Sequence, residues 1–201
     1  MGPFCESYIN SRTDIGPSTR TNFLQTKRVL VAYFGAKRLL KTITPADGDR
    51  WKRWLLSDAQ LAQATVSKYI KRSKQMLNEA VRDRLLDSNP FADIKGMSEA
   101  NPDRMFYVNT ETSLKLLKAL PSLSWKCIFV LSRFCGMRAP SEVLSLKWSD
   151  VDFARGRIRI DSSKTGLRFC PLFPHVRELL LEARKEHVGS GGYVIADYRR
   201  G

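Results

Sequence analysis

The chain has 201 residues, of which 43% are hydrophobic and 27% charged, and its formal net charge is +14. This composition supports a buried core and excludes a globally disordered chain, and the length is that of one or two domains. No apolar run approaches the roughly 20 residues that a membrane span requires, and no N-terminal apolar stretch resembles a signal peptide.

The positive charge is shared by both halves of the chain. Residues 1–97 hold 17 lysines and arginines against 9 acidic residues, and residues 98–201 hold 17 against 11. Two basic segments suit a long polyanion such as nucleic acid, whereas the alternative is a solvated basic surface that serves solubility. The four cysteines show no C-x-x-C spacing, so they predict neither a metal site nor a disulfide framework. They indicate reduced, mostly buried thiols in a cytoplasmic protein.

The first half is predicted to be helical. Residues 1–17 are polar, contain two Gly-Pro pairs and are expected to form a flexible leader. A helix is predicted over 18–34, before a glycine that ends it. The sequence Thr-Pro-Ala-Asp at 44–47 opens a second helix with an N-cap, a proline in the first turn and an acid three residues after the cap. The longest helix is predicted over 65–86, with Asn89-Pro90 as its stop.

The second half is predicted to mix helices with a few strands. Residues 98–105 lack hydrophobic periodicity and are expected to be a linker. The alternating sequence at 157–160 predicts a strand, which pairs with 167–172 across a Thr-Gly turn. Helices are predicted from Asn109 or Thr110 to Pro121, and over 124–135, 141–146 and 175–186. The expected fold is mainly α with a small antiparallel β-sheet.

The predicted helix over 65–86 carries a cluster of cations. Within two turns, on and beside the face opposite its apolar stripe, it places Lys68, Lys71, Arg72 and Lys74. Cations at this spacing suit contacts along a phosphate backbone. A solvated helix face is the ordinary alternative, and this helix alone does not decide between the two.

A longer motif follows in the second half. Residues 135–152 read CGMRAPSEVLSLKWSDVD, and GRIRI, SKTG and a Pro-Leu step follow in that order. This segment resembles the catalytic domain of the tyrosine recombinases, the phage-integrase family of site-specific DNA recombinases. Residues 18–97 resemble the family's SAM-like helical core-binding domain. The resemblance implies that residues 106–201 form the N-terminal part of an α+β catalytic domain.

The resemblance also implies roles for individual residues. Arg138 corresponds to the first catalytic arginine, which stabilises negative charge on the phosphate oxygens in the transition state. Lys164, at the tip of the predicted hairpin, corresponds to the lysine that protonates the leaving 5′-oxygen. Arg168, just past the turn, is expected to contact a phosphate.

Glu142 corresponds to an acid that orients the active site. In the family the acid usually stands three positions after the arginine, whereas Glu142 stands four positions after Arg138. Pro140 suits the first turn of a helix, so the extra residue is expected in the loop before it. The alternative reading of Glu142 is an exposed ion pair with Arg138, one helical turn away.

By this resemblance the parent protein binds double-stranded DNA, cuts one strand through a 3′-phosphotyrosine link and rejoins it, working as a tetramer on DNA. It uses neither a metal nor a nucleotide cofactor, acts on no small molecule and binds no membrane. Integration, excision and resolution remain open. A helix-turn-helix regulator and an interaction protein that binds no nucleic acid are the alternative functions.

The family's remaining catalytic groups are a His-x-x-Arg pair and a nucleophilic tyrosine. Neither His175 nor His187 is followed by an arginine at the third position, and Tyr193 and Tyr198 come too early in the order. Two expectations compete, a fragment of a longer recombinase and a truncated relative that kept only DNA binding. Both predict that this polypeptide binds DNA without cleaving it.

Overall fold

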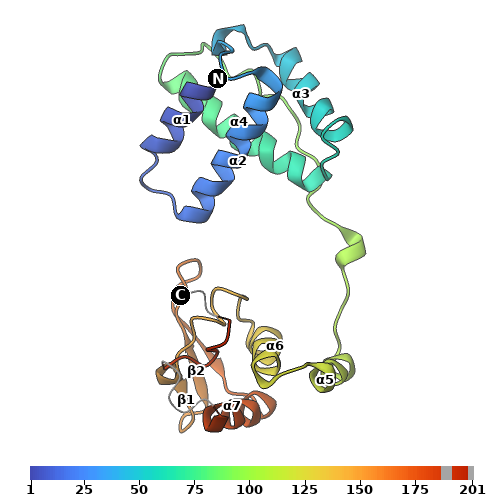
Figure 1. Cartoon of the computed structure of the whole chain (residues 1–201), viewed down its shortest axis with the longest axis vertical. Coiled ribbons are helices and arrows are strands. Elements are labelled where there is room, and N and C mark those ends of the chain that lie inside the picture. Colours follow the sequence, from blue (N-terminus) through green and yellow to red (C-terminus); the bar gives the residue numbers. More distant parts are fainter. Residues whose placement is uncertain (187–191, 199–201) are drawn as a thin grey trace. The chain divides into compact units, whose positions relative to one another are not determined.

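The computed structural model describes residues 1–186 and 192–198 (Figure 1). His187 lies outside the described residues. The chain divides into two compact units, Met1–Phe106 and Tyr107–Gly201. Among the described residues, every helix is too short or too polar to cross a membrane.

The first unit is helical, as predicted. It consists of α1 (Gly2–Ser11), α2 (Pro17–Phe34), α3 (Pro45–Ser57) and α4 (Gln63–Arg82), with short 3-10 helices at Leu40–Thr42 and Pro102–Arg104. Helix α4 packs against each of the other three α-helices, which Figure 1 draws in blue to green. The fully buried rings of Trp51 and Phe91 stack with their centroids 5.3 Å apart at the centre of this core.

The prediction of a flexible leader over residues 1–17 is wrong. Helix α1 buries Cys5, Tyr8 and Ile9 in the core, and the Tyr8 ring lies edge-on to Phe23 at 5.5 Å between centroids. The buried residues recur at a spacing of three to four, which is the period of a helix. The Gly-Pro pair at the start does not break the helix, because a proline in the first turn lacks only an N–H that would have no partner there.

The predicted start of α3 is confirmed, whereas the predicted end of α4 is not. The capping box at the start of α3 is confirmed: the Asp47 N–H donates to Thr44 Oγ1 at 3.2 Å, and the Thr44 N–H donates to Asp47 Oδ2 at 3.0 Å. The predicted end of α4 near Asn89 is wrong. The helix ends at Arg82, because Arg84 adopts a left-handed conformation with φ 57° and the N–H of Leu85 bonds back to the Ala80 carbonyl at 2.8 Å.

The second unit packs two helices on a three-stranded antiparallel sheet. Its elements are α5 (Thr110–Ala119), α6 (Leu123–Cys135), a 3-10 turn at Trp148–Asp150, β1 (Val151–Asp152), β2 (Arg157–Ile160), β3 (Arg168–Pro171) and α7 (Pro174–Glu186). Helices α6 and α7 contact each other, and their apolar residues share a core with Ile158 and Ile160. Asn109 is the residue that caps α5. The mainly α fold with a small antiparallel sheet is confirmed.

The pairing of β2 with β3 sets the position of the hairpin. Ile158 lies opposite Cys170, and Ile160 lies opposite Arg168. Both isoleucines are buried while Arg159 between them is exposed, which is the alternation expected of a strand with one face on the core. The strand prediction over 157–160 is therefore confirmed, and residues 161–167 form the hairpin loop.

The helix predicted over 141–146 is not formed. Residues 139–145 are consecutive turns, in which the Glu142 and Leu144 N–H groups bond to the carbonyls four residues back. The Val143 N–H between them donates to the Arg138 carbonyl, five residues back, at 3.3 Å. The unbroken series of i to i−4 bonds that defines an α-helix is therefore interrupted.

The capping box gives a stability prediction. Replacing Thr44 with alanine is expected to lower the free energy of unfolding by about 1 kcal/mol, because the Asp47 N–H loses its acceptor. Urea unfolding followed by circular dichroism measures the change. The control is Ser18→Ala in the first turn of α2, an exposed serine that caps no N–H in the described residues, with an expected change below about 0.5 kcal/mol. Equal losses in the two variants would contradict the prediction.

Candidate functional site

The candidate site begins where α6 ends. Gly136 adopts a left-handed conformation with φ 60°, and its N–H caps the helix by bonding to the Leu131 carbonyl. The buried side chain of Met137 follows, and the next side chain, Arg138, is exposed. The Glu142 N–H then bonds to the Arg138 carbonyl at 2.8 Å, which brings the acid back over the arginine despite the interruption of the helix.

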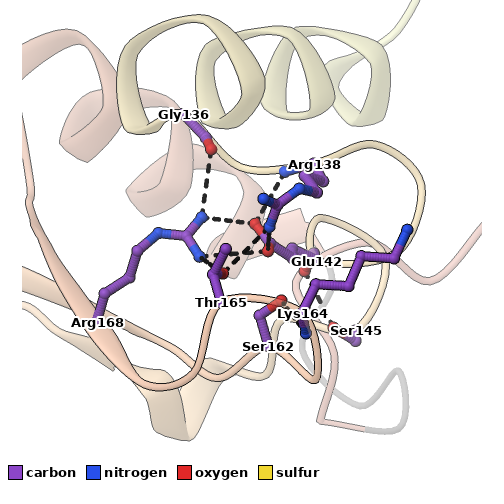
Figure 2. Close-up of polar contacts among 8 residues, drawn as sticks. All are labelled: Gly136, Arg138, Glu142, Ser145, Ser162, Lys164, Thr165 and Arg168. Atoms are coloured by element: carbon purple, nitrogen blue, oxygen red, sulfur yellow. Dashed lines mark hydrogen bonds and ion pairs between the residues drawn. The ribbon is translucent and has the colours of Figure 1, made fainter.

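The Glu142 carboxylate is the centre of the site (Figure 2). Its side chain is only 3% exposed. Oε1 accepts hydrogen bonds from Nη1 of Arg138 at 2.7 Å and from Nη1 of Arg168 at 3.2 Å. Oε2 accepts from the backbone N–H of Arg138 at 2.9 Å and from Nη2 of Arg168 at 2.6 Å. One buried carboxylate therefore binds two arginines from separate segments.

These bonds keep the carboxylate ionised. The hydrogen bond from Arg168 lowers the pKa of Glu142 far below its usual range, against the opposing effect of burial, and bonds from the Arg138 backbone, Ser162 and the Arg138 side chain add to the shift. The same pair raises the pKa of Arg168. Two guanidinium groups around one carboxylate leave the cluster with a net positive charge, which suits an anionic ligand.

The hairpin loop supplies a further group to this cluster. The Thr165 hydroxyl oxygen lies 3.1 Å from Nη1 of both Arg138 and Arg168 and accepts from each. Lys164 is different: its side chain is exposed and extends away from the Glu142 carboxylate (Figure 2). The structure thus brings together Arg138, Glu142 and Arg168, but it does not bring the Lys164 ammonium to them.

This geometry changes the interpretation of two predicted residues. The reading of Glu142 as half of an exposed ion pair is wrong, because the carboxylate is buried. Arg168, expected as a phosphate contact, also makes a two-point bond with the predicted acid. The linear spacing from Arg138 gives no signal for this contact, since it depends on the register of β3 against β2.

The basic residues of α4 lie on two different parts of the first unit. Lys68, Lys71 and Arg72 line a groove of about 320 Å³ together with Arg12 and Thr19. The Arg12 guanidinium is paired with Asp14 at 2.6 Å, and Glu99 also lines the groove, so the cations that the groove offers are those of one face of α4.

Lys74 lies outside that group. Its ammonium donates to the Ala92 carbonyl at 2.7 Å, and its own carbonyl accepts from Asn89 Nδ2 at 3.0 Å. Asn89 Oδ1 in turn accepts from the Phe91 N–H at 2.8 Å. Lys74 therefore helps to hold the segment after α4 against the helix.

Comparison with known proteins gives a match to one family model, a relative by sequence and a set of solved structures with the same fold. Residues 2–97 match the phage integrase SAM-like domain. Over 135 residues the chain is 25% identical to tyrosine recombinase XerC of Pediococcus pentosaceus. That alignment covers 65% of the chain and 44% of the XerC sequence, so the chain spans less than half of this relative.

Solved integrase structures share the fold. A lambda integrase fragment, a dimer bound to a COC′ core site, matches with a TM-score of 0.79 at 17% identity, covering 98% of this chain and 73% of that one. A lambda integrase tetramer bound to a Holliday junction matches with a TM-score of 0.78 at 18% identity, covering 98% and 60%. At these identities the two structures show the fold alone. The chain is therefore similar to the phage integrase SAM-like domain over residues 2–97 and to a tyrosine recombinase over 135 residues, and it shares the integrase fold.

Proposed function

We propose that the 201 residues of this chain bind duplex DNA without cleaving it by themselves, and that they serve site-specific recombination, in which DNA strands are cut and rejoined through a 3′-phosphotyrosine link. The observation that carries the proposal is the exposed guanidinium of Arg138, held on the buried carboxylate of Glu142. Similarity to lambda integrases bound to DNA as a dimer and as a tetramer supports duplex DNA as the ligand and assembly into multimers on it.

The chemistry of strand transfer suits this arrangement. Attack on a phosphodiester places extra negative charge on the non-bridging oxygens, and a guanidinium stabilises it with two parallel hydrogen bonds. Arg138 has the role of this guanidinium, and Glu142 fixes its orientation. An arginine remains charged at any working pH, so Arg138 needs no proton transfer to stabilise the phosphate.

Lys164 is proposed to protonate the leaving 5′-oxygen. An ammonium gives up a proton where a guanidinium effectively does not. The lysine lies on the exposed loop 161–167 between β2 and β3, and a side chain in that position reaches a groove of DNA without displacing the sheet. The Lys164 side chain extends away from Glu142 in the structure, so this role requires the side chain to turn toward the bound DNA (Figure 2).

The two compact units suit two separate roles in DNA binding and catalysis. We assign core binding of DNA to the first unit, with Lys68, Lys71 and Arg72 as contacts to the phosphate backbone, and assign the second unit to the N-terminal part of the catalytic domain. Lys74 is a weaker candidate for the phosphate backbone because its ammonium is already bonded to Ala92. The cytoplasm is the compartment we propose, since DNA is its substrate.

Neutralised phosphates give a salt-dependence prediction. The variant with Lys68, Lys71 and Arg72 all changed to glutamine is expected to bind a random 30-bp duplex more weakly. The slope of log K against log salt is expected to fall by roughly 2 to 3, because each lost phosphate contact removes about 0.9. Fluorescence anisotropy at several salt concentrations measures both the affinity and the slope.

Single variants provide the matched comparison. Lys71→Gln is set against Arg82→Gln, which removes a cation from the last turn of the same helix, where it is 79% exposed and pairs with Glu79. The first is expected to lower the slope by about one and the second to leave it unchanged. Salt-insensitive binding by the unchanged chain would refute the DNA-binding proposal, and equal effects of the two variants would refute the assignment to this groove.

The role of Glu142 gives a prediction about pH. Glu142→Gln is expected to lower the free energy of unfolding at pH 7 by about 1–3 kcal/mol, because two arginines lose their anionic acceptor. The loss stays below that for a fully buried pair, since the guanidinium groups remain partly exposed. Urea unfolding at a series of pH values measures it, with hydrogen exchange in β2 and β3 locating the affected unit.

The sign follows from the lowered pKa of Glu142. In the unfolded chain this carboxyl has its ordinary pKa of 4.5 and protonates before the folded carboxyl does. The stabilisation is therefore present above that pH and is lost as the pH falls through the folded pKa. The difference between the two proteins is therefore expected to be constant above about pH 6 and to shrink below 4.5. Asp150 and Asp161 each pair with Arg159, and these three residues line a cavity together with Glu142. They are present in both proteins, so their own protonation does not change the difference between the two. A difference that grows on acidification would contradict the prediction.

A further inference from the structure

Arg168 joins two segments that are distant in the sequence. It is the first residue of β3, and its side chain reaches back to the turn after α6 (Figure 2). There Nη2 donates to the Gly136 carbonyl at 3.2 Å and to Glu142 Oε2 at 2.6 Å. One guanidinium therefore holds the start of β3 against the segment that carries Arg138.

The hydrogen bonds that Arg168 makes within the protein leave few of its N–H donors for a ligand. A guanidinium has five N–H donors, of which four are on the Nη atoms. Nη1 donates to Glu142 Oε1 at 3.2 Å and to Thr165 Oγ1 at 3.1 Å, and Nη2 makes the two bonds to Gly136 and Glu142. The protein itself thus satisfies all four Nη donors of Arg168.

Arg138 keeps a different set of donors. Its Nη1 donates to Glu142 and Thr165, whereas Nη2 and Nε have no partner within residues 1–186 and 192–198. Its side chain is 44% exposed, against 31% for Arg168. The edge formed by Nε and Nη2 is one that donates two parallel bonds to the oxygens of a phosphate. The two arginines around Glu142 are therefore not equivalent.

We propose that Arg168 is a positioning residue: it holds the Glu142 carboxylate so that this carboxylate orients Arg138, and it does not itself bind the phosphate. The inference rests on the proposed function and deepens it, because only Arg138 then faces the scissile phosphodiester. It replaces the expectation that Arg168 is a phosphate contact. Removing Arg168 takes away the two hydrogen bonds that it donates to Glu142 and releases the start of β3 from the Gly136 carbonyl.

The test uses the full chain and dimethyl phosphate, a small phosphodiester. The Nε–H signal of Arg138 in ¹⁵N NMR reports its order without ligand and its contact with phosphate on titration. In Arg168→Gln we expect this signal to broaden or to exchange faster, and the affinity for dimethyl phosphate to fall roughly 5- to 20-fold. In Arg168→Lys, which keeps a charge but not the two-point geometry, we expect an intermediate loss. Arg155→Gln, an exposed cation after β1 that pairs with Asp152, is the matched control and is expected to change neither readout.

A double-mutant cycle separates positioning from direct contact. If Arg168 acts through Arg138, Arg168→Gln has no further effect on the affinity for phosphate in an Arg138→Gln background; a direct contact would add its own loss there. The carboxyl signal of Glu142 in ¹³C NMR is also expected to titrate at a higher pH in Arg168→Gln, a change that general loosening of the fold would not produce.

The outcomes separate the two proposals. If the unchanged chain fails to bind dimethyl phosphate at Arg138, the proposed function loses its phosphate site. The positioning role is then still tested by comparing the Arg138 Nε–H signal without ligand between the unchanged chain and Arg168→Gln. Positioning alone is overturned if phosphate binds at Arg138 but the Arg138 signal and affinity are unchanged in Arg168→Gln, or if the two losses are additive. Amide spectra of each variant verify that the chain is folded.

Discussion

The second unit depends on one buried carboxylate. A carboxylate out of contact with water is costly unless its oxygens are hydrogen-bonded and its charge is balanced. Glu142 meets both needs with two guanidinium groups and one backbone N–H, and the hydrogen bond from Arg168 is the largest cause of its lowered pKa. Because the partners come from the turn after α6 and from β3, satisfying this carboxylate also fixes those segments against each other.

The surroundings of the carboxylate explain why the arginine faces solvent in a defined orientation. The left-handed Gly136 ends α6, and the buried Met137 anchors the chain before Arg138 projects outward. Nη1 of Arg138 donates hydrogen bonds to Glu142 and Thr165, and the edge formed by Nε and Nη2 has no partner in the described residues. In the proposed function Arg138 binds a phosphate, and a group that is already ordered loses less conformational entropy on binding.

In the first unit the relevant feature is a set of cations on the surface of one helix, and not a single buried contact. Helix α4 buries its apolar side against the other helices and leaves Lys68 and Lys71 exposed beside a groove. Lys74 belongs to the same run of cations, yet its ammonium is bonded to the Ala92 carbonyl. Position along the helix therefore separates cations that remain available to a polyanion from one that stabilises the fold.

Local patterns by themselves determined the elements whose causes are local. The capping box at Thr44 and the alternation of Ile158 and Ile160 rest on neighbours within a few residues, so the sequence was enough to predict α3 and β2. The motif around Arg138 likewise indicated a resemblance to the tyrosine recombinases and named Arg138 and Glu142, which the structure brings together. Only the tertiary structure decided that the first residues form α1, that Glu142 is buried and that Arg168 binds it, because each depends on segments that meet after folding. The register of β3 against β2 and the burial of a charge are long-range properties, and no spacing in the chain encodes them.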